Sequence, residues 1–152
     1  MASDKPTNGW DTISTQHFME VCQRSFHFLI DDFNFKPIPL PEGKFVNKFQ
    51  YRLSNGTITV VILGEGYGTV ASVTLFDNRG RQAGVNRLVP GFNPSAKYKR
   101  KKETKSQDEQ IEDAANKLRL HGQDVLSGDL TRFDQISYNI DELMAKINQG
   151  TK

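Results

Sequence analysis

The side chains best suited to bind a charged ligand lie together in one short segment of the chain. Five of the six residues from position 97 to position 102 are basic and the other is aromatic: Lys97, Tyr98, Lys99, Arg100, Lys101 and Lys102. Basic side chains that contact phosphates release counterions, and an aromatic ring can stack on a base. This pattern indicates salt-dependent, sequence-nonspecific binding to nucleic acid as one candidate function.

A solvated linker is the competing interpretation of the same segment. Residues 97–105 carry a local charge of +5 while the whole chain carries +2, so the rest of the chain sums to −3. Basic runs between polar residues usually belong to solvated segments. We therefore expect residues 93–106 to form a basic mobile loop, with nucleic-acid binding as the alternative function.

Groups suited to acid-base or nucleophilic catalysis are sparse. The only histidines are His17, His27 and His121, and none is spaced to share a metal with another histidine or a cysteine. The single cysteine, Cys22, falls on the apolar side of a predicted helix, where it acts as a small hydrophobic residue. We expect no enzyme activity, no metal site and no cofactor.

A glycine-rich segment, residues 64–68 with the sequence Gly-Glu-Gly-Tyr-Gly, resembles a phosphate-binding loop only in its glycines. It joins two predicted strands rather than a strand and a helix, and no Lys-Ser or Lys-Thr pair follows it. We interpret it as a hairpin loop. Glu65 and an exposed Tyr67 are the residues in it that we expect to contact a protein partner.

The composition is that of a single soluble domain. The chain has 152 residues, of which 36% are hydrophobic and 25% charged. The lone cysteine fits a reducing compartment, and neither a signal peptide nor a stretch of about 18 apolar residues is present. We expect one cytoplasmic domain spanning residues 1–152, with frayed ends at 1–10 and 149–152 and no membrane contact.

Periodic hydrophobic residues predict the first helix and a set of strands. Residues 14–33 form an amphipathic helix with Phe18, Cys22, Phe26, Leu29 and Phe33 on one face, ended by Asn34 and Pro37. Prolines at 37, 39 and 41 indicate an edge segment or loop. Alternation predicts strands at 45–53, 57–63 and 69–76, with Asn55-Gly56 as a hairpin turn, and a short edge strand running into a turn at 81–89.

Two helices are predicted after the basic loop. Ser106 and Glu109 form a capping-box pattern before a helix at 106–126, in which we interpret Gly122 as a packing concession rather than a break. Gly128 should end that helix in a left-handed conformation. A last helix begins at Asp129 or Thr131, and its predicted buried residues are Phe133, Ile136, Ile140, Leu143, Met144 and Ile147.

The order of elements favours a two-layer α+β fold. An N-terminal helix and two C-terminal helices would pack on one face of an antiparallel meander of three or four strands. The sequence leaves open whether the second face of the sheet is covered.

The ends of the chain resemble a group of small uncharacterised bacterial proteins. The similarity lies in the phenylalanine-rich first helix, the strand meander and the motifs A-x-x-L-R, here residues 115–119, and D-V-L-x-G-D-x-x-x-F, here residues 124–133. The resemblance implies an α+β fold and a bacterial source. Some of these proteins resemble immunity partners of secreted toxins, although this chain departs from their acidic character through its basic segment.

The leading prediction is a small protein-interaction module, immunity-like in class, rather than an enzyme. One face of the sheet or the loop at 64–68 would bind a protein partner.

Overall fold

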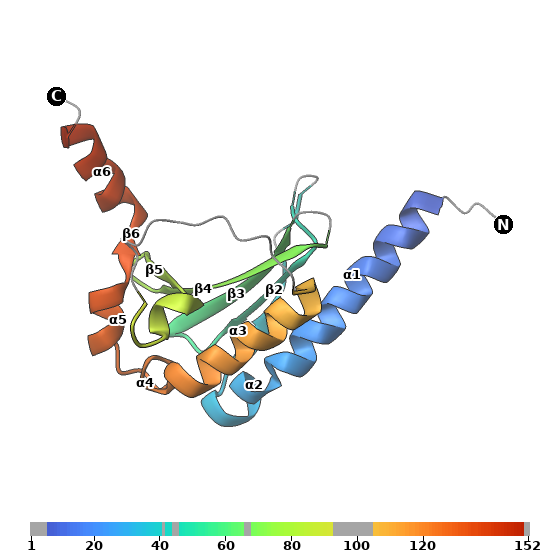
Figure 1. Cartoon of the computed structure of the whole chain (residues 1–152), viewed down its shortest axis with the longest axis horizontal. Coiled ribbons are helices and arrows are strands. Elements are labelled where there is room, and N and C mark those ends of the chain that lie inside the picture. The colour runs from blue at the N-terminus through green and yellow to red at the C-terminus, as the bar shows by residue number, and fades with distance from the viewer. Residues whose placement is uncertain (1–5, 41, 44–45, 66–67, 93–104, 151–152) are drawn as a thin grey trace.

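A computed structural model of the chain describes residues 6–40, 42–43, 46–65, 68–92 and 105–150 (Figure 1). The helices are α1 (Pro6–Ser25), α2 (His27–Phe33), α3 (Gln107–His121), α4 (Gln123–Leu126), α5 (Thr131–Ile136) and α6 (Ile140–Gly150), with a 3-10 turn η1 (Val85–Leu88). The strands are β1 (Lys36–Ile38), β2 (Gln50–Ser54), β3 (Ile58–Glu65), β4 (Val70–Asp77), β5 (Arg81–Gly84) and β6 (Tyr138–Asn139). The predicted α+β class is confirmed.

The strands form one antiparallel sheet in the order β1-β2-β3-β4-β5-β6. The prediction of three or four strands was therefore too low. One additional strand is β1, which uses the proline segment as an edge, where a missing N–H donor is tolerated. The other is β6, a two-residue strand that pairs with β5, so β5 is not the edge strand that the sequence predicted.

One face of the sheet forms the hydrophobic core with the helices. Paired positions of antiparallel strands point to the same face, and this register aligns Leu53, Val60, Leu75 and Ala83 across four strands. These side chains are buried together with Phe18 from α1 and other residues of the helices. Figure 1 shows α1 and α3 side by side against the sheet, as predicted for the first helix and for the helix that follows the basic segment.

The first helix is longer than predicted and is interrupted once. It begins at Pro6 rather than residue 14, and it breaks at Phe26, whose backbone lies outside the helical region before α2 resumes at His27. Asn34 ends α2, as the sequence predicted, and has a positive φ of 61°. The predicted core face is confirmed for Phe18, Cys22, Phe26 and Leu29, while Phe33 is half-buried.

The first hairpin was predicted in the right place, but its leading strand was predicted too long. The strand β2 starts at Gln50 instead of residue 45, because Asn47 directs its side-chain oxygen to the N–H of Phe49 and its amide to the carbonyl of Gly64. In the turn, Gly56 has a φ of 91°, and the Asn55 oxygen accepts from the N–H groups of Thr57 and Ile58. Of the two turn residues only the glycine has a positive φ, whereas the tightest hairpin turns formed by an Asn-Gly pair have a positive φ at both residues.

The helix α3 begins with the predicted capping box and bonds the start of β4. Ser106 accepts from the N–H of Glu109, and the Glu109 carboxylate accepts from the N–H of Ser106. The strand β5 pairs only with residues 74–76 of β4, so the preceding backbone of β4 lies beyond the end of β5. Gln110 accepts from the N–H of Ala71 at 2.9 Å, and Gln107 donates to the carbonyl of Val70 at 2.9 Å. Side-chain amides therefore act there in place of a neighbouring strand.

Gly122 is a break in the helix, so our prediction of an uninterrupted helix there was wrong. Its φ of −110° and ψ of 10° end α3, and α4 starts at the next residue. The close approach predicted for this glycine is confirmed, since a Cβ atom would lie 2.8 Å from the carbonyl oxygen of Leu118 and 3.2 Å from Leu88. Gly128 has the predicted positive φ, at 99°.

The predicted last helix is two helices separated by a strand. Ser137 is extended and buried, and Arg81 donates to its hydroxyl at 2.8 Å and to its carbonyl at 2.7 Å. Tyr138 and Asn139 then pair with β5. The Asn139 side chain accepts from the N–H groups of Asp141 and Glu142, which caps α6. Phe133 is buried as predicted and Ile136 is half-buried, whereas Ile140, Leu143, Met144 and Ile147 of α6 are exposed.

Arg132 joins the segments around the helix break at Gly122. Its guanidinium donates to both carboxylate oxygens of Asp124, at 2.7 and 3.0 Å. It also donates to the carbonyl of Leu88 at 2.9 Å and to the carbonyl of His121. One side chain therefore satisfies acceptors from η1, the end of α3 and the start of α4, while itself lying on α5.

The Asp124–Arg132 pair makes the free energy of unfolding depend on pH in the acidic range. The hydrogen bond from Arg132 lowers the pKa of the Asp124 carboxyl below its usual range, against the opposing effect of partial burial. A lowered pKa in the folded state contributes stability above the unfolded pKa, near 4, and this contribution is lost as the pH falls through the folded value.

We therefore expect Asp124→Asn to lower the free energy of unfolding at neutral pH and to flatten its decline below about pH 4. Urea unfolding at a series of pH values measures both effects. If the free energy of unfolding declined equally below about pH 4 in the wild type and the variant, Asp124 would not be the source of this pH dependence.

Candidate protein-docking surface

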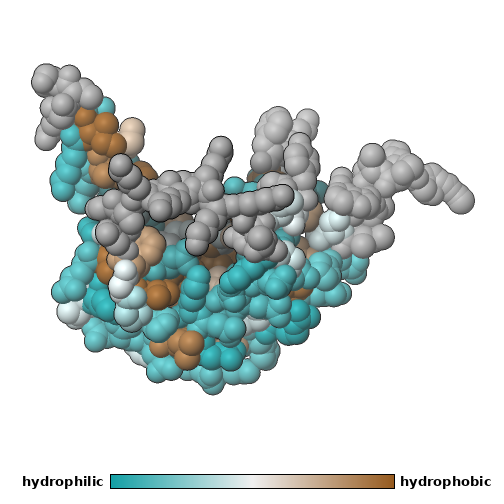
Figure 2. Space-filling view, viewed as in Figure 1, coloured by the Kyte–Doolittle hydropathy of each residue, from teal (hydrophilic) through white to brown (hydrophobic). Residues whose placement is uncertain are grey.

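Four large hydrophobic side chains lie exposed along α6. Ile140 is 46% exposed, Leu143 41%, Met144 52% and Ile147 51%. Their spacing of three, one and three residues places them on one side of the helix, and we call this set the α6 stripe. Figure 2 shows hydrophobic surface on α6, at the upper left, beyond the mainly hydrophilic surface of the body.

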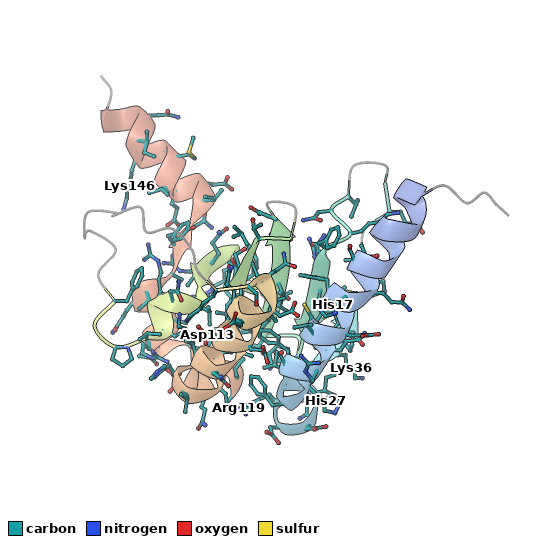
Figure 3. The ribbon with its side chains drawn as sticks, turned by 45° about the vertical axis from the view of Figure 1, so that its right-hand side comes forward. His17, His27, Lys36, Asp113, Arg119 and Lys146 are labelled. Carbon is teal, nitrogen blue, oxygen red and sulfur yellow. The ribbon has the colours of Figure 1, made fainter. Side chains whose placement is uncertain are left out.

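The α6 stripe was predicted to pack on the sheet, and that prediction was wrong. The helix follows β6 at the edge of the sheet and points away from it (Figure 1). Lys146 on α6 is correspondingly remote from Asp113, Arg119 and His17, which lie on α3 and α1 (Figure 3). The hydrophobic residues of α6 therefore do lie on one side of a helix, but that side does not face the core of this molecule.

An arginine and two aromatic rings lie where α6 begins. The Arg87 guanidinium lies 5.4 Å from the ring centre of Tyr138 and 5.9 Å from that of Phe92, and it donates to the carbonyl of Ile136 at 3.1 Å. Phe92 is 45% exposed. Arginine and aromatic side chains are the types most enriched at the centres of protein interfaces, so this Arg87 stack extends the candidate surface at the base of α6.

Asp141 and Lys146 lie on the two sides of the α6 stripe. Asp141 and Glu142 lie in the first turn of the helix, which is the favourable end for negative charge, and Lys146 lies one turn after Glu142. Glu142 approaches Arg81 at 3.9 Å with 70% of its side chain exposed. A helix with a hydrophobic strip between charged positions is typical of helix-mediated protein recognition.

The residues predicted to bind a partner are not brought to this surface. Glu65 is exposed at the end of β3, opposite Val70 of β4, and this tip lies across the molecule from α6 (Figure 1). Tyr67 lies outside the described residues. So do the predicted nucleic-acid contacts, which are Lys97, Tyr98, Lys99, Arg100, Lys101 and Lys102.

The second face of the sheet is mostly polar. The register places Arg52, Val61 and Thr74 in one row across it, and Ser54, Thr59 and Phe76 in the next. Among these Val61 is buried while the others are half-buried. Antiparallel sheets commonly present such a face to solvent, so the α6 stripe is the more apolar of the two surfaces.

Two of the three histidines and the cysteine contact other residues of the fold. His17 on α1 lies 2.7 Å from Asp108 on α3, and His27 lies 3.3 Å from Asp31 one turn later. Burial, together with the charge of Asp108, raises the pKa of Cys22 to about 12, so the thiol is protonated at neutral pH. Arg119 of α3 lies over the ring of Phe28 at 4.6 Å, which links α3 to α2 (Figure 3).

Within the described ranges no group of three or more His, Cys, Asp or Glu side chains is placed to hold a metal ion. None of the described helices combines the length and the hydropathy that a membrane crossing requires. No family model, curated protein or solved structure matches the chain.

Proposed function

We propose that this chain is a protein-interaction module whose docking element is α6. The observation that carries the proposal is the α6 stripe, in which four neighbouring hydrophobic side chains are each between 41% and 52% exposed. Isolated exposed hydrophobic residues are ordinary, but a contiguous apolar strip rimmed by charge indicates a surface that is covered by another protein.

The length of α6 supports the same proposal. An isolated helix of fewer than about 12 residues is marginal in water, because its stability in proteins comes from packing of its apolar face. The helix α6 has 11 residues, and it packs on the rest of the chain mainly at β6, through its first turn. A bound partner would supply the contacts that the α6 stripe lacks.

The immunity-like class expected from the C-terminal motif remains part of this proposal. In that case the partner protein would be a toxin. The hydrophobic residues of the motif itself, Val125, Leu126 and Phe133, are buried, which supports a structural role for the motif rather than direct contact with a partner.

Site-specific crosslinking tests the proposal. A photoreactive benzoylphenylalanine at position 144 of the full chain should crosslink to a protein, a second copy included, when the chain is irradiated in cells. The same group at position 120, which replaces Leu120, a residue of α3 that is 72% exposed, is the matched control and should not give that product.

Affinity for the crosslinked protein, once purified, should then depend on the α6 stripe. We expect Leu143→Asp with Met144→Asp to weaken binding at least about tenfold, since charge replaces apolar surface at the interface. Leu120→Asp should leave the affinity unchanged. Equal affinities for all three proteins would overturn the proposal.

A further inference from the structure

We infer that a cleft at the β1 edge of the sheet binds a small carboxylic acid with a hydrophobic body. The cleft and the α6 stripe lie at opposite edges of the sheet, because β1 and β6 are its outer strands and α6 follows β6. This binding site therefore goes beyond the proposed function and does not depend on it.

The cleft opens where β1 and β2 stop pairing. Their register ends with Ile38 opposite Arg52, although β2 starts two residues earlier in the chain, at Gln50. Residues 37–40 and 50–52 line the cleft from the two strands, and Met19 and Gln23 line it from α1. Its volume is about 310 Å³, which is at the lower end of the range of about 300–1,000 Å³ found for small-molecule sites. The space therefore suits a small ligand.

Hydrophobic side chains make up most of the lining of the cleft. They are Met19, Pro37, Ile38, Pro39, Leu40 and Tyr51. A proline has a fixed φ and no N–H group, so the wall formed by Pro37 and Pro39 is rigid and offers no backbone donor at these two positions. A rigid wall lowers the cost of ordering a site when a ligand binds, and methionine adapts its shape to what it contacts. This lining selects a hydrophobic ligand body.

Arg52 is the one charged side chain among the described residues that line the cleft. Its Nε donates to the side-chain oxygen of Gln50 at 2.6 Å. Gln50 is only 5% exposed, and its amide donates to the carbonyl of Asn47 at 3.0 Å. The buried glutamine thus orients the guanidinium. Within the part of the chain that the structure describes, the two terminal nitrogens of Arg52 have no hydrogen-bond or ion-pair partner.

The end of the Arg52 guanidinium matches the geometry of a carboxylate. Its two terminal nitrogens can donate parallel hydrogen bonds to both carboxylate oxygens, which is the arrangement that favours arginine in such sites. A phosphate monoester carries up to two negative charges near neutral pH, and the described lining holds one positive charge and no negative one. A hydrophobic acid with a single carboxylate therefore fits the cleft in both charge and polarity.

Two-dimensional amide NMR spectra of the purified full chain, titrated with octanoate, test the inference. We expect the amide signals of Ile38, Leu40 and residues 50–52 to shift until they saturate, with a dissociation constant of about 1 mM or below. Octanol has the same chain length but no charge, and it should bind at least about tenfold more weakly. Absence of saturable shifts at these residues, or equal affinity for octanol, would overturn the inference.

Two substitutions separate the charged from the hydrophobic part of the site. Arg52→Gln should weaken octanoate binding about tenfold and leave octanol binding unchanged, because only the carboxylate needs the guanidinium. Ile38→Ser should weaken both ligands several-fold, because it removes apolar surface at a side chain that is 37% exposed and not part of the core. Lys36→Gln is the matched control, since Lys36 is a basic residue of β1 that does not line the cleft. Equal octanoate affinity in Arg52→Gln and Lys36→Gln would exclude recognition of the carboxylate by Arg52.

The cleft and the α6 stripe can be tested separately in the same assay. Leu143→Asp with Met144→Asp should bind octanoate as the wild type does, because these residues do not line the cleft. Loss of octanoate binding in that variant would place the ligand on α6 and overturn the assignment to the cleft.

Discussion

Replacing Arg132 with alanine should lower the free energy of unfolding by about 2 kcal/mol. The substitution leaves the Asp124 carboxylate and the carbonyl of Leu88 without the donor that the folded protein provides. An acceptor that loses its partner on burial costs about 1–3 kcal/mol, and a charged one lies at the upper end. The site is partly exposed, with 36% of the Arg132 side chain accessible, so water replaces part of what is lost and a middle value is expected.

Urea unfolding of Arg132→Ala and two controls measures this effect. Arg132→Lys keeps the positive charge but lacks the planar fork that bonds several acceptors at once, so its loss should be intermediate. Arg79 pairs with Asp77 and Asp134. Its replacement by alanine should give a smaller loss, because the buried Asp77 carboxylate still accepts from the backbone N–H groups of residues 79 and 81. Equal losses for Arg132→Ala and Arg79→Ala would show that Arg132 does not join these segments.

Replacing Gly122 with alanine should destabilise the protein by about 1–3 kcal/mol. In an uninterrupted helix the same change would stabilise it by about 1 kcal/mol, because glycine is a poor helix former. Here the new Cβ atom would meet the Leu118 carbonyl oxygen at 2.8 Å and a Leu118 methyl at 2.7 Å. The backbone oxygen belongs to the last turn of α3 and has little freedom to move.

The sign of this effect decides between the two descriptions of residues 106–126. Gly84→Ala is the matched control, since Gly84 has a φ of −67° and no atom within 4 Å of a built Cβ. It should be neutral or slightly stabilising through the entropy of the unfolded chain. Stabilisation by Gly122→Ala, measured as a higher urea midpoint with an unchanged slope, would contradict the break at Gly122.

Local patterns were sufficient for several elements of the fold. The core face of the first helix, the hairpin at Gly56 and the capping box of Ser106 and Glu109 depend on residues close together in sequence, and each was predicted correctly. Gly128 likewise needs only its own missing Cβ to adopt a positive φ. These features follow from periodicity, turn chemistry and capping, which act within a few residues.

Local sequence patterns did not predict the candidate docking surface. The period of Ile140, Leu143, Met144 and Ile147 correctly indicated a helix with an apolar side, but a period does not state which surface that side faces. The residues that set its direction are Ser137, Tyr138 and Asn139, which the hydrophobic periodicity predicts to be part of one continuous helix. Asn139 is a good N-cap residue, and this is the one signal in the sequence that marks a new helix start at Ile140.

The sequence by itself determined the α+β class, the chain order of the meander and the hydrophobic side of each long helix, because these depend on local periodicity. The tertiary structure alone decided that β5 recruits Tyr138 and Asn139 as a sixth strand, and that Arg81 holds Ser137 extended. These contacts join residues more than 50 positions apart, so the hydrophobic periodicity of residues 133–147 does not reveal them. As a result α6 leaves the sheet at its edge with its hydrophobic side exposed.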